Sequence, residues 1–285
     1  MRTLRTVAEL RVALREPRLA GRSIGLVPTM GSFHEGHLSL MRKARRDCDA
    51  VVVSLFVNPT QFEQTADLSR YPRDEARDER MAADVGVDYL FVPTVAEVYP
   101  RGFTTTVSVA GITETLEGSR RGRGHFDGVV TVVTKLFNMV GPDVAYFGQK
   151  DAQQALVIQR LVRDLDIPVL IEVCPTVRER DGLAMSSRNA HLSPEERARA
   201  LAISRALENA VAVVAAGERD AAKVAGSARA EMTSEGVEPE YFELVSTDTL
   251  APASVIDDSV LAVVAAQVGA TRLIDNQIIA TNGRN

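Results

Sequence analysis

The residues best suited to chemistry are two histidines in the segment 28–37, PTMGSFHEGH. His34 and His37 are three residues apart, so on a helix they share one face. Residues 24–27 are apolar and partly β-branched and predict a buried strand, while apolar residues at helical spacing follow the segment. A strand, a tight glycine-containing turn and a helix start therefore place the imidazoles where backbone N–H groups and the helix dipole attract anions. The pattern favours a site where the imidazoles bind polyphosphate or stabilise charge developing on it.

Other interpretations of the histidine pair are open. A His-x-x-His pair can be half of a metal site, although no cysteine, further histidine or paired acid lies nearby in the sequence. The two side chains can also lie on a helix surface without any role. The segment is neither a dinucleotide-binding fingerprint nor a P-loop, because neither glycine pattern occurs in it.

A second polar segment, 58–62, follows the predicted strand 50–57 and contains Asn58 and Gln61. A proline directly after Asn58 stops regular structure, so the sequence predicts a loop. The two amides offer neutral donors and acceptors that suit a small polar acid or amide. An Asn-Pro turn with a purely structural role is the alternative.

A second strand, turn and helix are predicted over residues 143–165, and the turn contains Lys150 and Asp151. Lys150 can neutralise a phosphate, whereas the plainer alternative is an N-cap aspartate beside a surface lysine. Further along, Ser186, Ser187 and Arg188 follow a glycine-containing stretch. Arginine makes bidentate contacts with phosphate and serine hydroxyls add donors, so this loop could swing over a bound nucleotide.

The elements that position these residues are predicted from hydrophobic periodicity. Strands at 24–27, 50–57, 88–92, 143–147 and 168–173 alternate with helices, which predicts an α/β fold with a doubly wound parallel sheet and right-handed crossovers. This Rossmann-like N-terminal domain spans residues 1–176. Residues 177–285 form a smaller α+β C-terminal domain that would act as a lid, with helices at 194–216 and 220–234 and strands at 241–246, 260–266 and 271–279.

Four segments receive weaker predictions. Residues 104–109 are rich in β-formers and predict an edge strand or an excursion from the sheet. The glycine- and arginine-rich residues 117–126 predict a mobile basic loop or a solvated loop. The charged run 74–80, within a helix predicted over 72–85, predicts a solvated face. Asp275 and Asn276 receive no chemical role.

Composition excludes several classes of protein. The chain of 285 residues with 45% hydrophobic and 25% charged residues is ordinary for a globular protein. Its formal net charge of -5 argues against general nucleic-acid binding. No apolar run is long enough to cross a bilayer and no signal peptide is evident, so no membrane partner is expected. Cys48 and Cys174 are the only cysteines, which fits a reducing compartment and a cytoplasmic location.

Four motifs together resemble a known family. The segment 28–37 resembles the His-x-Gly-His signature of the nucleotidylyltransferase superfamily, and its longer form resembles the pantothenate synthetase (pantoate–β-alanine ligase) family. Residues 56–62 resemble that family's Phe-Val-Asn-Pro-x-Gln-Phe segment, 147–154 its Phe-Gly-x-Lys-Asp-x-Gln-Gln block and 185–189 its Met-Ser-Ser-Arg-Asn loop. The chain departs from the family where Gly122 and Arg123 stand in place of Arg-Pro.

The resemblance implies an ATP-dependent condensation of (R)-pantoate with β-alanine to pantothenate, through a pantoyl adenylate, with release of pyrophosphate and AMP. It implies that domain 1–176 binds nucleotide and pantoate, that Mg²⁺ is brought mainly by ATP, with protein ligands unknown, and that the protein is a homodimer. The catalytic residues implied are His34, His37, Lys150, Ser186, Ser187 and Arg188. Asn58, Gln61 and Gln154 would bind substrate. The ATP site would comprise Met30, Gly31, Ser32, Phe33, His34, Glu35, Gly36, His37, Gly148, Gln149, Lys150, Asp151, Val177, Met185, Ser186, Ser187 and Arg188. The alternatives are another nucleotidylyltransferase with the same signature or a non-catalytic nucleotide-binding protein.

Overall fold

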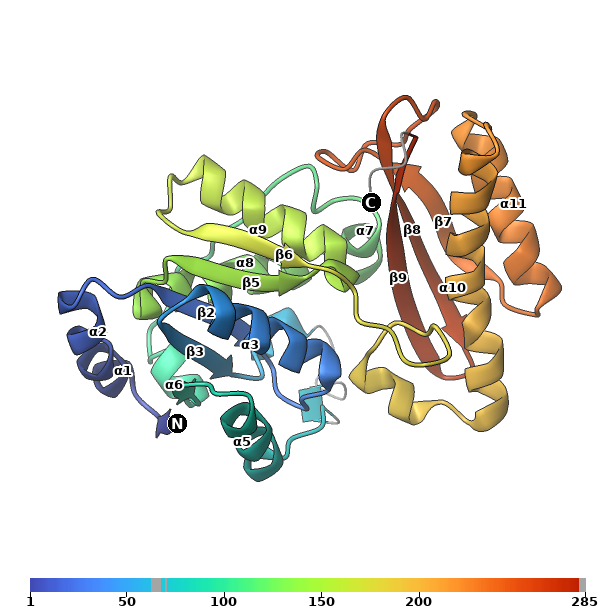
Figure 1. The fold of residues 1–285 in the computed structure, drawn as a ribbon. Coiled ribbons are helices and arrows are strands. Elements are labelled where there is room, and N and C mark those ends of the chain that lie inside the picture. The colour runs from blue at the N-terminus through green and yellow to red at the C-terminus, as the bar shows by residue number, and fades with distance from the viewer. Residues whose placement is uncertain (63–67, 70, 282–285) are drawn as a thin grey trace. The chain divides into compact units, whose positions relative to one another are not determined.

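The computed structural model describes residues 1–62, 68–69 and 71–281, apart from the side chain of Arg123. Contacts between residues divide the chain into two compact units (Figure 1). The first comprises Met1–Gly148 and Gln153–Pro175, and the second comprises Gln149–Ala152 and Thr176–Asn285. The chain therefore enters the second unit briefly at Gln149, returns to the first, and enters the second again at Thr176.

The first unit is built on a parallel sheet of six strands in the order β1-β4-β3-β2-β5-β6. The central pair β2 and β3 is in register from Ile24 opposite Ala50 to Thr29 opposite Leu55. From β2 the sheet continues through β3 and β4 on one side and through β5 and β6 on the other. This reversal of direction makes the sheet doubly wound, as predicted. The strands are β1 (Arg2–Leu4), β2 (Ile24–Thr29), β3 (Ala50–Leu55), β4 (Tyr89–Phe91), β5 (Val144–Gly148) and β6 (Leu170–Cys174).

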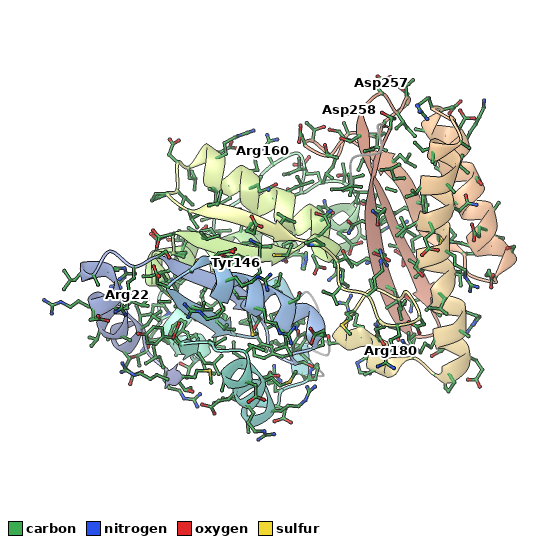
Figure 2. All side chains as sticks on the ribbon, viewed as in Figure 1. Arg22, Tyr146, Arg160, Arg180, Asp257 and Asp258 are labelled. Carbon is green, nitrogen blue, oxygen red and sulfur yellow. The ribbon has the colours of Figure 1, made fainter. Side chains whose placement is uncertain are left out.

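Helices cover this sheet because their apolar stripes need a buried partner. Leu40, Met41 and Ala44 of α3 pack with Ala82 of α5 against the strands, together with the fully buried Tyr146 of β5 (Figure 2). Right-handed crossovers place α8 and α9 on the other face. The helices are α1 (Val7–Ala13), α2 (Arg15–Leu19), α3 (Glu35–Asp47), α5 (Glu75–Asp84), α6 (Val95–Val98), α7 (Glu117–Arg121), α8 (Arg123–Val140) and α9 (Ala152–Asp164).

The second unit packs two long helices on an antiparallel sheet of three strands in the order β7-β8-β9. Ser193 caps the longer helix in a capping box with Glu196, which lies three residues further along the chain. Alternating apolar residues of β8 and small residues of both helices fill the core. The elements are α10 (Pro194–Ala215), α11 (Ala221–Ser234), β7 (Pro239–Val245), β8 (Ser259–Val268) and β9 (Thr271–Ala280).

The structure adds detail to, or differs from, the sequence predictions in four segments. Residues 104–109 form no strand, although Val107 exchanges backbone hydrogen bonds with the Thr131 hydroxyl of α8. Residues 117–126 form α7 and the first turn of α8, separated by Gly122 at a φ of 73°, rather than a loop. Residues 59–61 form a short 3-10 turn, η1. Asp78 is buried, so the run 74–80 is not entirely a solvated face.

Among the residues that the structure describes, no helix is both long enough and apolar enough to cross a membrane.

Candidate functional site

The histidine segment links β2 to α3 in the first unit, as predicted. Gly31 and Ser32 adopt left-handed backbone conformations with φ values of 89° and 54°. Glycine adopts this conformation readily, whereas a serine needs a local reason to hold it. His34 is the N-cap of α3 and its Nδ1 accepts a 3.2 Å hydrogen bond from the backbone N–H of Gly36. The turn therefore ends with an imidazole at the position where serine or aspartate commonly stands.

The two imidazoles lie against each other. Their ring centroids are 4.1 Å apart with an angle of 36° between the planes. Nδ1 of His37 faces the backbone N–H of His34 at 3.4 Å, and with the Gly36 contact this forms a capping box. Because both Nδ1 atoms accept from the backbone, the proton of each neutral ring is assigned to Nε2. An Nε2–H donor at a helix N-terminus is suited to a phosphate oxygen.

Asp78 explains the backbone conformation of the turn. Its carboxylate accepts hydrogen bonds from the backbone N–H groups of Ser32 at 2.7 Å and Phe33 at 2.8 Å. Asp78 is only 1% exposed, and its Oδ2 lies 3.0 Å from the point where a side chain on Gly31 would begin. The N–H groups of Ser32 and Phe33 are thus engaged by the protein's own carboxylate. The spacing of Asp78 one helical turn before the buried Ala82 was the available sequence signal.

Asn58 is the N-cap of η1 and Gln61 is its last residue. Their side chains contact each other, and that of Gln61 also contacts Met30. Asn58 Nδ2 donates to Gln61 Oε1 at 3.1 Å, and Gln61 Nε2 contacts the sulfur of Met30 at 2.9 Å. Asn58 is 1% exposed, and its amide also bonds the carbonyl of Gly128 and the hydroxyl of Tyr99. Asn58 therefore fixes the turn, whereas Gln61 is half-buried. Both stay predicted substrate ligands.

Helix α8 packs against η1. It begins at Arg123, where the sequence departs from the family pattern. His125 Nδ1 lies 2.9 Å from the carbonyl oxygen of Gln61. A side chain at Gly128 would begin 2.4 Å from the carbonyl oxygen of Thr60, so only glycine allows this close approach. Arg121 forms an ion pair with Glu117 in the same helical turn, and the side chain of Arg123 lies outside the description.

The two glutamines that begin α9 have different surroundings. Gln153 is buried, and its amide bonds the carbonyls of Ile112 and Thr115 and the N–H of Glu117. This glutamine holds the segment before α7 in place. Gln154 is half-buried and remains the predicted pantoate ligand.

In the second unit, Lys150 lies in the short helix η2 (Gln149–Asp151), which is bonded to β9. The Asn276 side-chain amide donates to the carbonyls of Gln149 and Lys150, both at 2.9 Å. Asn276 Oδ1 accepts from Gln149 Nε2 at 2.9 Å. The backbone that carries Lys150 is therefore held by a residue 126 positions further along the chain.

The Ser-Ser-Arg loop begins η3 (Ser187–His191), and Ser186 is its N-cap. Residues 177–185 form a hairpin before it, in which the N–H of Met185 donates to the carbonyl of Val177 at 2.9 Å. The hairpin thus brings together two residues predicted to bind ATP. Nη1 and Nη2 of Arg178 donate to the two carboxylate oxygens of Asp275, at 2.6 and 3.2 Å.

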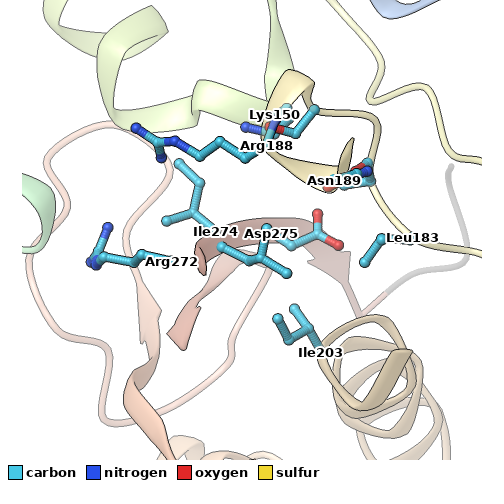
Figure 3. A pocket seen from close by; sticks show the side chains of 11 residues that line it. Lys150, Leu183, Arg188, Asn189, Ile203, Arg272, Ile274 and Asp275 are labelled. Carbon is cyan, nitrogen blue, oxygen red and sulfur yellow. The ribbon is translucent and has the colours of Figure 1, made fainter. Parts of the chain in front are cut away.

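A pocket in the second unit is lined by residues of η2, of the Ser-Ser-Arg loop and of β9 (Figure 3). Three residues predicted to bind ATP line it, namely Lys150, Ser186 and Arg188, and Arg272 adds a third cationic side chain that sequence reasoning missed. Arg272 pairs with Glu240 of β7 at 2.9 Å. Burial raises the pKa of the Asp275 carboxyl in this pocket, and the adjacent Arg178 opposes that rise. Lys150 and Arg188 are cationic side chains of the kind that bind phosphate, whereas Arg272 is paired with Glu240 and Asp275 is paired with Arg178.

The other residues predicted to bind ATP are neighbours in sequence of His34, His37 and Lys150. Glu35 is exposed and pairs with Arg42, whose guanidinium lowers the pKa of the Glu35 carboxyl. The backbone N–H of Gly36 donates the hydrogen bond that His34 Nδ1 accepts. Gly148 ends β5 in the first unit, and the exposed Asp151 lies beside Lys150 in the second.

The doubly wound parallel sheet with a strand–turn–helix histidine motif places the protein in the class of nucleotide-binding α/β proteins. A family model described as pantoate-beta-alanine ligase matches residues 2–278, so the chain belongs to that family. The resemblance drawn from the four motifs is confirmed.

Relatives and solved structures agree with this assignment. The chain is 53% identical over 283 residues to a pantothenate synthetase of Moorella thermoacetica, covering 99% of this chain and 100% of the relative. It resembles the crystal structure of pantothenate synthetase from Thermus thermophilus with a TM-score of 0.92 and 47% identity, covering 97% and 99% of the two chains. A pantoate-beta-alanine ligase from Francisella tularensis, described as complexed with beta-gamma ATP and beta-alanine, has a TM-score of 0.81 and 33% identity, covering 98% and 97%.

Proposed function

We propose that this protein catalyses the ATP-dependent condensation of (R)-pantoate with β-alanine to pantothenate, as a carbon–nitrogen ligase of pantothenate biosynthesis. The observation that carries the proposal is the full-length similarity to pantothenate synthetases at about half identical residues. The pantoate carboxylate attacks the α-phosphorus of ATP, giving pantoyl adenylate and pyrophosphate. The β-alanine amine then attacks the acyl carbon and releases AMP.

The protein's part in this chemistry is to position substrates and stabilise charge, since both nucleophiles come from the substrates. His34 and His37 donate Nε2–H to phosphate oxygens as negative charge develops on the leaving pyrophosphate. Lys150, Ser186, Ser187 and Arg188 bind the phosphates. The pocket lined by three of these four side chains supports their shared role.

Gln61 and Gln154 are proposed to hold pantoate, with Asn58 fixing the orientation of Gln61. The 3.1 Å hydrogen bond between the Asn58 and Gln61 amides supports this division of roles. The second unit is proposed to contribute the lid over ATP, which keeps water from the reactive adenylate.

Mg²⁺ is proposed to arrive with ATP. No group of three or more histidine, cysteine, aspartate or glutamate side chains suited to a metal ion occurs among the described residues. ATP phosphates and water molecules would then supply most ligands, which is common for Mg²⁺. The ion would add positive charge at the phosphates.

A cytoplasmic location is proposed because both cysteines are free thiols. A homodimer is proposed from the resemblance to the family, and light scattering tests it. Another nucleotidylyltransferase activity is not favoured, because the family match covers residues 2–278.

The test of the function is pantothenate formation from (R)-pantoate, β-alanine and ATP, with AMP as the coproduct. Release of a dinucleotide-like product from a phosphorylated acceptor would instead support the other nucleotidylyltransferase activity. ATP binding without turnover of any acid would indicate a nucleotide-binding protein.

A further inference from the structure

Two adjacent residues of β9, Asp275 and Asn276, are both buried at 4% exposure. Successive side chains of a strand face opposite sides of the sheet, so a buried polar pair of neighbours needs partners on both sides. β9 is an edge strand of the three-stranded sheet. The partners of these two side chains are the two segments that carry the phosphate-binding candidates.

Asn276 bonds the first segment. Its two amide hydrogens are donated to the carbonyl oxygens of Gln149 and Lys150, and its oxygen accepts from the Gln149 side chain. Both donors of the amide and its acceptor are therefore used by consecutive residues of η2. An aspartate at this position would be nearly the same size but would set a carboxylate against two carbonyl oxygens.

Asp275 bonds the second segment. Its carboxylate accepts hydrogen bonds from Nη1 and Nη2 of Arg178, and Arg178 Nη1 also donates to the carbonyl of Gly182 at 3.1 Å. Arg178 pairs with Ala184 in an isolated bridge, so the ion pair fixes the hairpin that leads directly into Ser186. Such a bidentate pair constrains orientation as well as distance.

We propose that Asp275 and Asn276 are positioning residues for the adenylation step, which hold Lys150 and the Ser186–Arg188 loop in register around one pocket (Figure 3). The inference rests on the proposed function, since it concerns the phosphates of ATP. Neither residue needs to touch a reacting atom. Loss of either anchor displaces a phosphate-binding cation while leaving Gln61 and Gln154, the predicted pantoate ligands of the first unit, unchanged.

The two half-reactions distinguish positioning from general stability. Adenylation requires the cations that stabilise departing pyrophosphate, whereas aminolysis of supplied pantoyl adenylate does not. For Asn276→Asp we expect the kcat of pantoate-dependent ATP–pyrophosphate exchange to fall on the order of 100-fold, as for a small displacement of catalytic groups. The rate of AMP release from supplied pantoyl adenylate and β-alanine should stay within about twofold, well below that factor.

Two further variants keep the test decisive if Asn276→Asp fails to fold. Arg178→Lys keeps a cation at a partly exposed position but loses the bidentate geometry, so it should show the same selective loss of exchange. Asn209→Ala is the matched control, because Asn209 accepts a hydrogen bond from Ser227 in the same unit without lining the pocket. The control should leave both half-reactions unchanged.

Unchanged exchange in folded Asn276→Asp and Arg178→Lys, or an equal loss of both half-reactions, would overturn the inference while the proposed function stands. Absence of pantoate-dependent exchange in the unaltered protein would overturn the proposed function itself, and the two failures are thereby distinguished.

Discussion

The carboxylate of Asp78 accepts a 2.7 Å hydrogen bond from the backbone N–H of Ser32, 46 residues away in the sequence. With the second bond, to Phe33, it occupies a backbone concavity that would otherwise bind an external anion. Helix α5 thus fixes the turn that presents His34 and His37. The phosphate-binding donors of this turn are therefore expected to be the imidazoles rather than these two N–H groups.

Replacement of Asp78 by asparagine should weaken both stability and catalysis. The new amide sets a donor against one of two N–H donors, so we expect a loss of about 1–3 kcal/mol in the free energy of unfolding. The KM for ATP in pyrophosphate exchange should rise. Urea unfolding and exchange kinetics measure the two effects. Asp84→Asn, an exposed position of the same helix, is the control, and equal behaviour of both variants would refute the role of Asp78.

The separate roles of the two nitrogens of His37 can be tested with a pair of variants. Asparagine places an oxygen near the Nδ1 position and can preserve the capping contact, whereas glutamine can place an amide donor near Nε2. If Nε2–H stabilises phosphate, His37→Asn should lose about 100-fold to 1000-fold in the kcat of exchange, as for one lost oxyanion donor. His37→Gln should retain more activity. Full activity of His37→Asn would mean that His37 only caps the helix.

Gly128→Ala tests the approach of α8 to η1. The added carbon would lie 2.4 Å from the Thr60 carbonyl, so we expect a destabilisation of about 1–3 kcal/mol by overpacking. Displacement of η1 should also raise the KM for pantoate through Gln61. Gly124→Ala in the same helix meets no atom within 4 Å and should be neutral or stabilising. Similar results for both glycines would contradict this packing argument.

Both thiols should be unreactive in the native protein. Burial raises the pKa of Cys48 and raises the pKa of Cys174 to about 11, so neither is a thiolate at pH 8. Labelling with a chromogenic disulfide should be slow before unfolding and should count two thiols after it. Rapid labelling of the native protein, or fewer than two thiols in denaturant, would contradict this prediction.

Hydrophobic periodicity was sufficient for the repeating elements. It predicted β2, β3, β5, β6 and the helices between them, because each buries an apolar face whose period is local in the sequence. It failed where a contact with a residue far away in the sequence determines the local structure or burial. Asp78 resembles its charged neighbours until the Ser32 turn is placed beside it, and residues 117–126 form helices partly because Gln153 bonds the Glu117 backbone.

In the candidate site, too, the features that depend on local sequence were predicted and those that depend on distant partners were not. The histidine, lysine and serine–arginine motifs were evident, since their chemistry depends on residue type and short spacing. Arg272, Asn276 and Asp275 could not be assigned, because their partners lie about 30 to 130 residues away and a strand pattern alone does not reveal them.

The most direct test of the central claim is isotope exchange between pyrophosphate and ATP, measured with (R)-pantoate present and β-alanine absent. The proposed function predicts exchange that depends on pantoate, followed by release of AMP and pantothenate when β-alanine is added. Exchange that requires a different acid would contradict the substrate assignment, and absence of exchange with any acid would contradict adenylation itself.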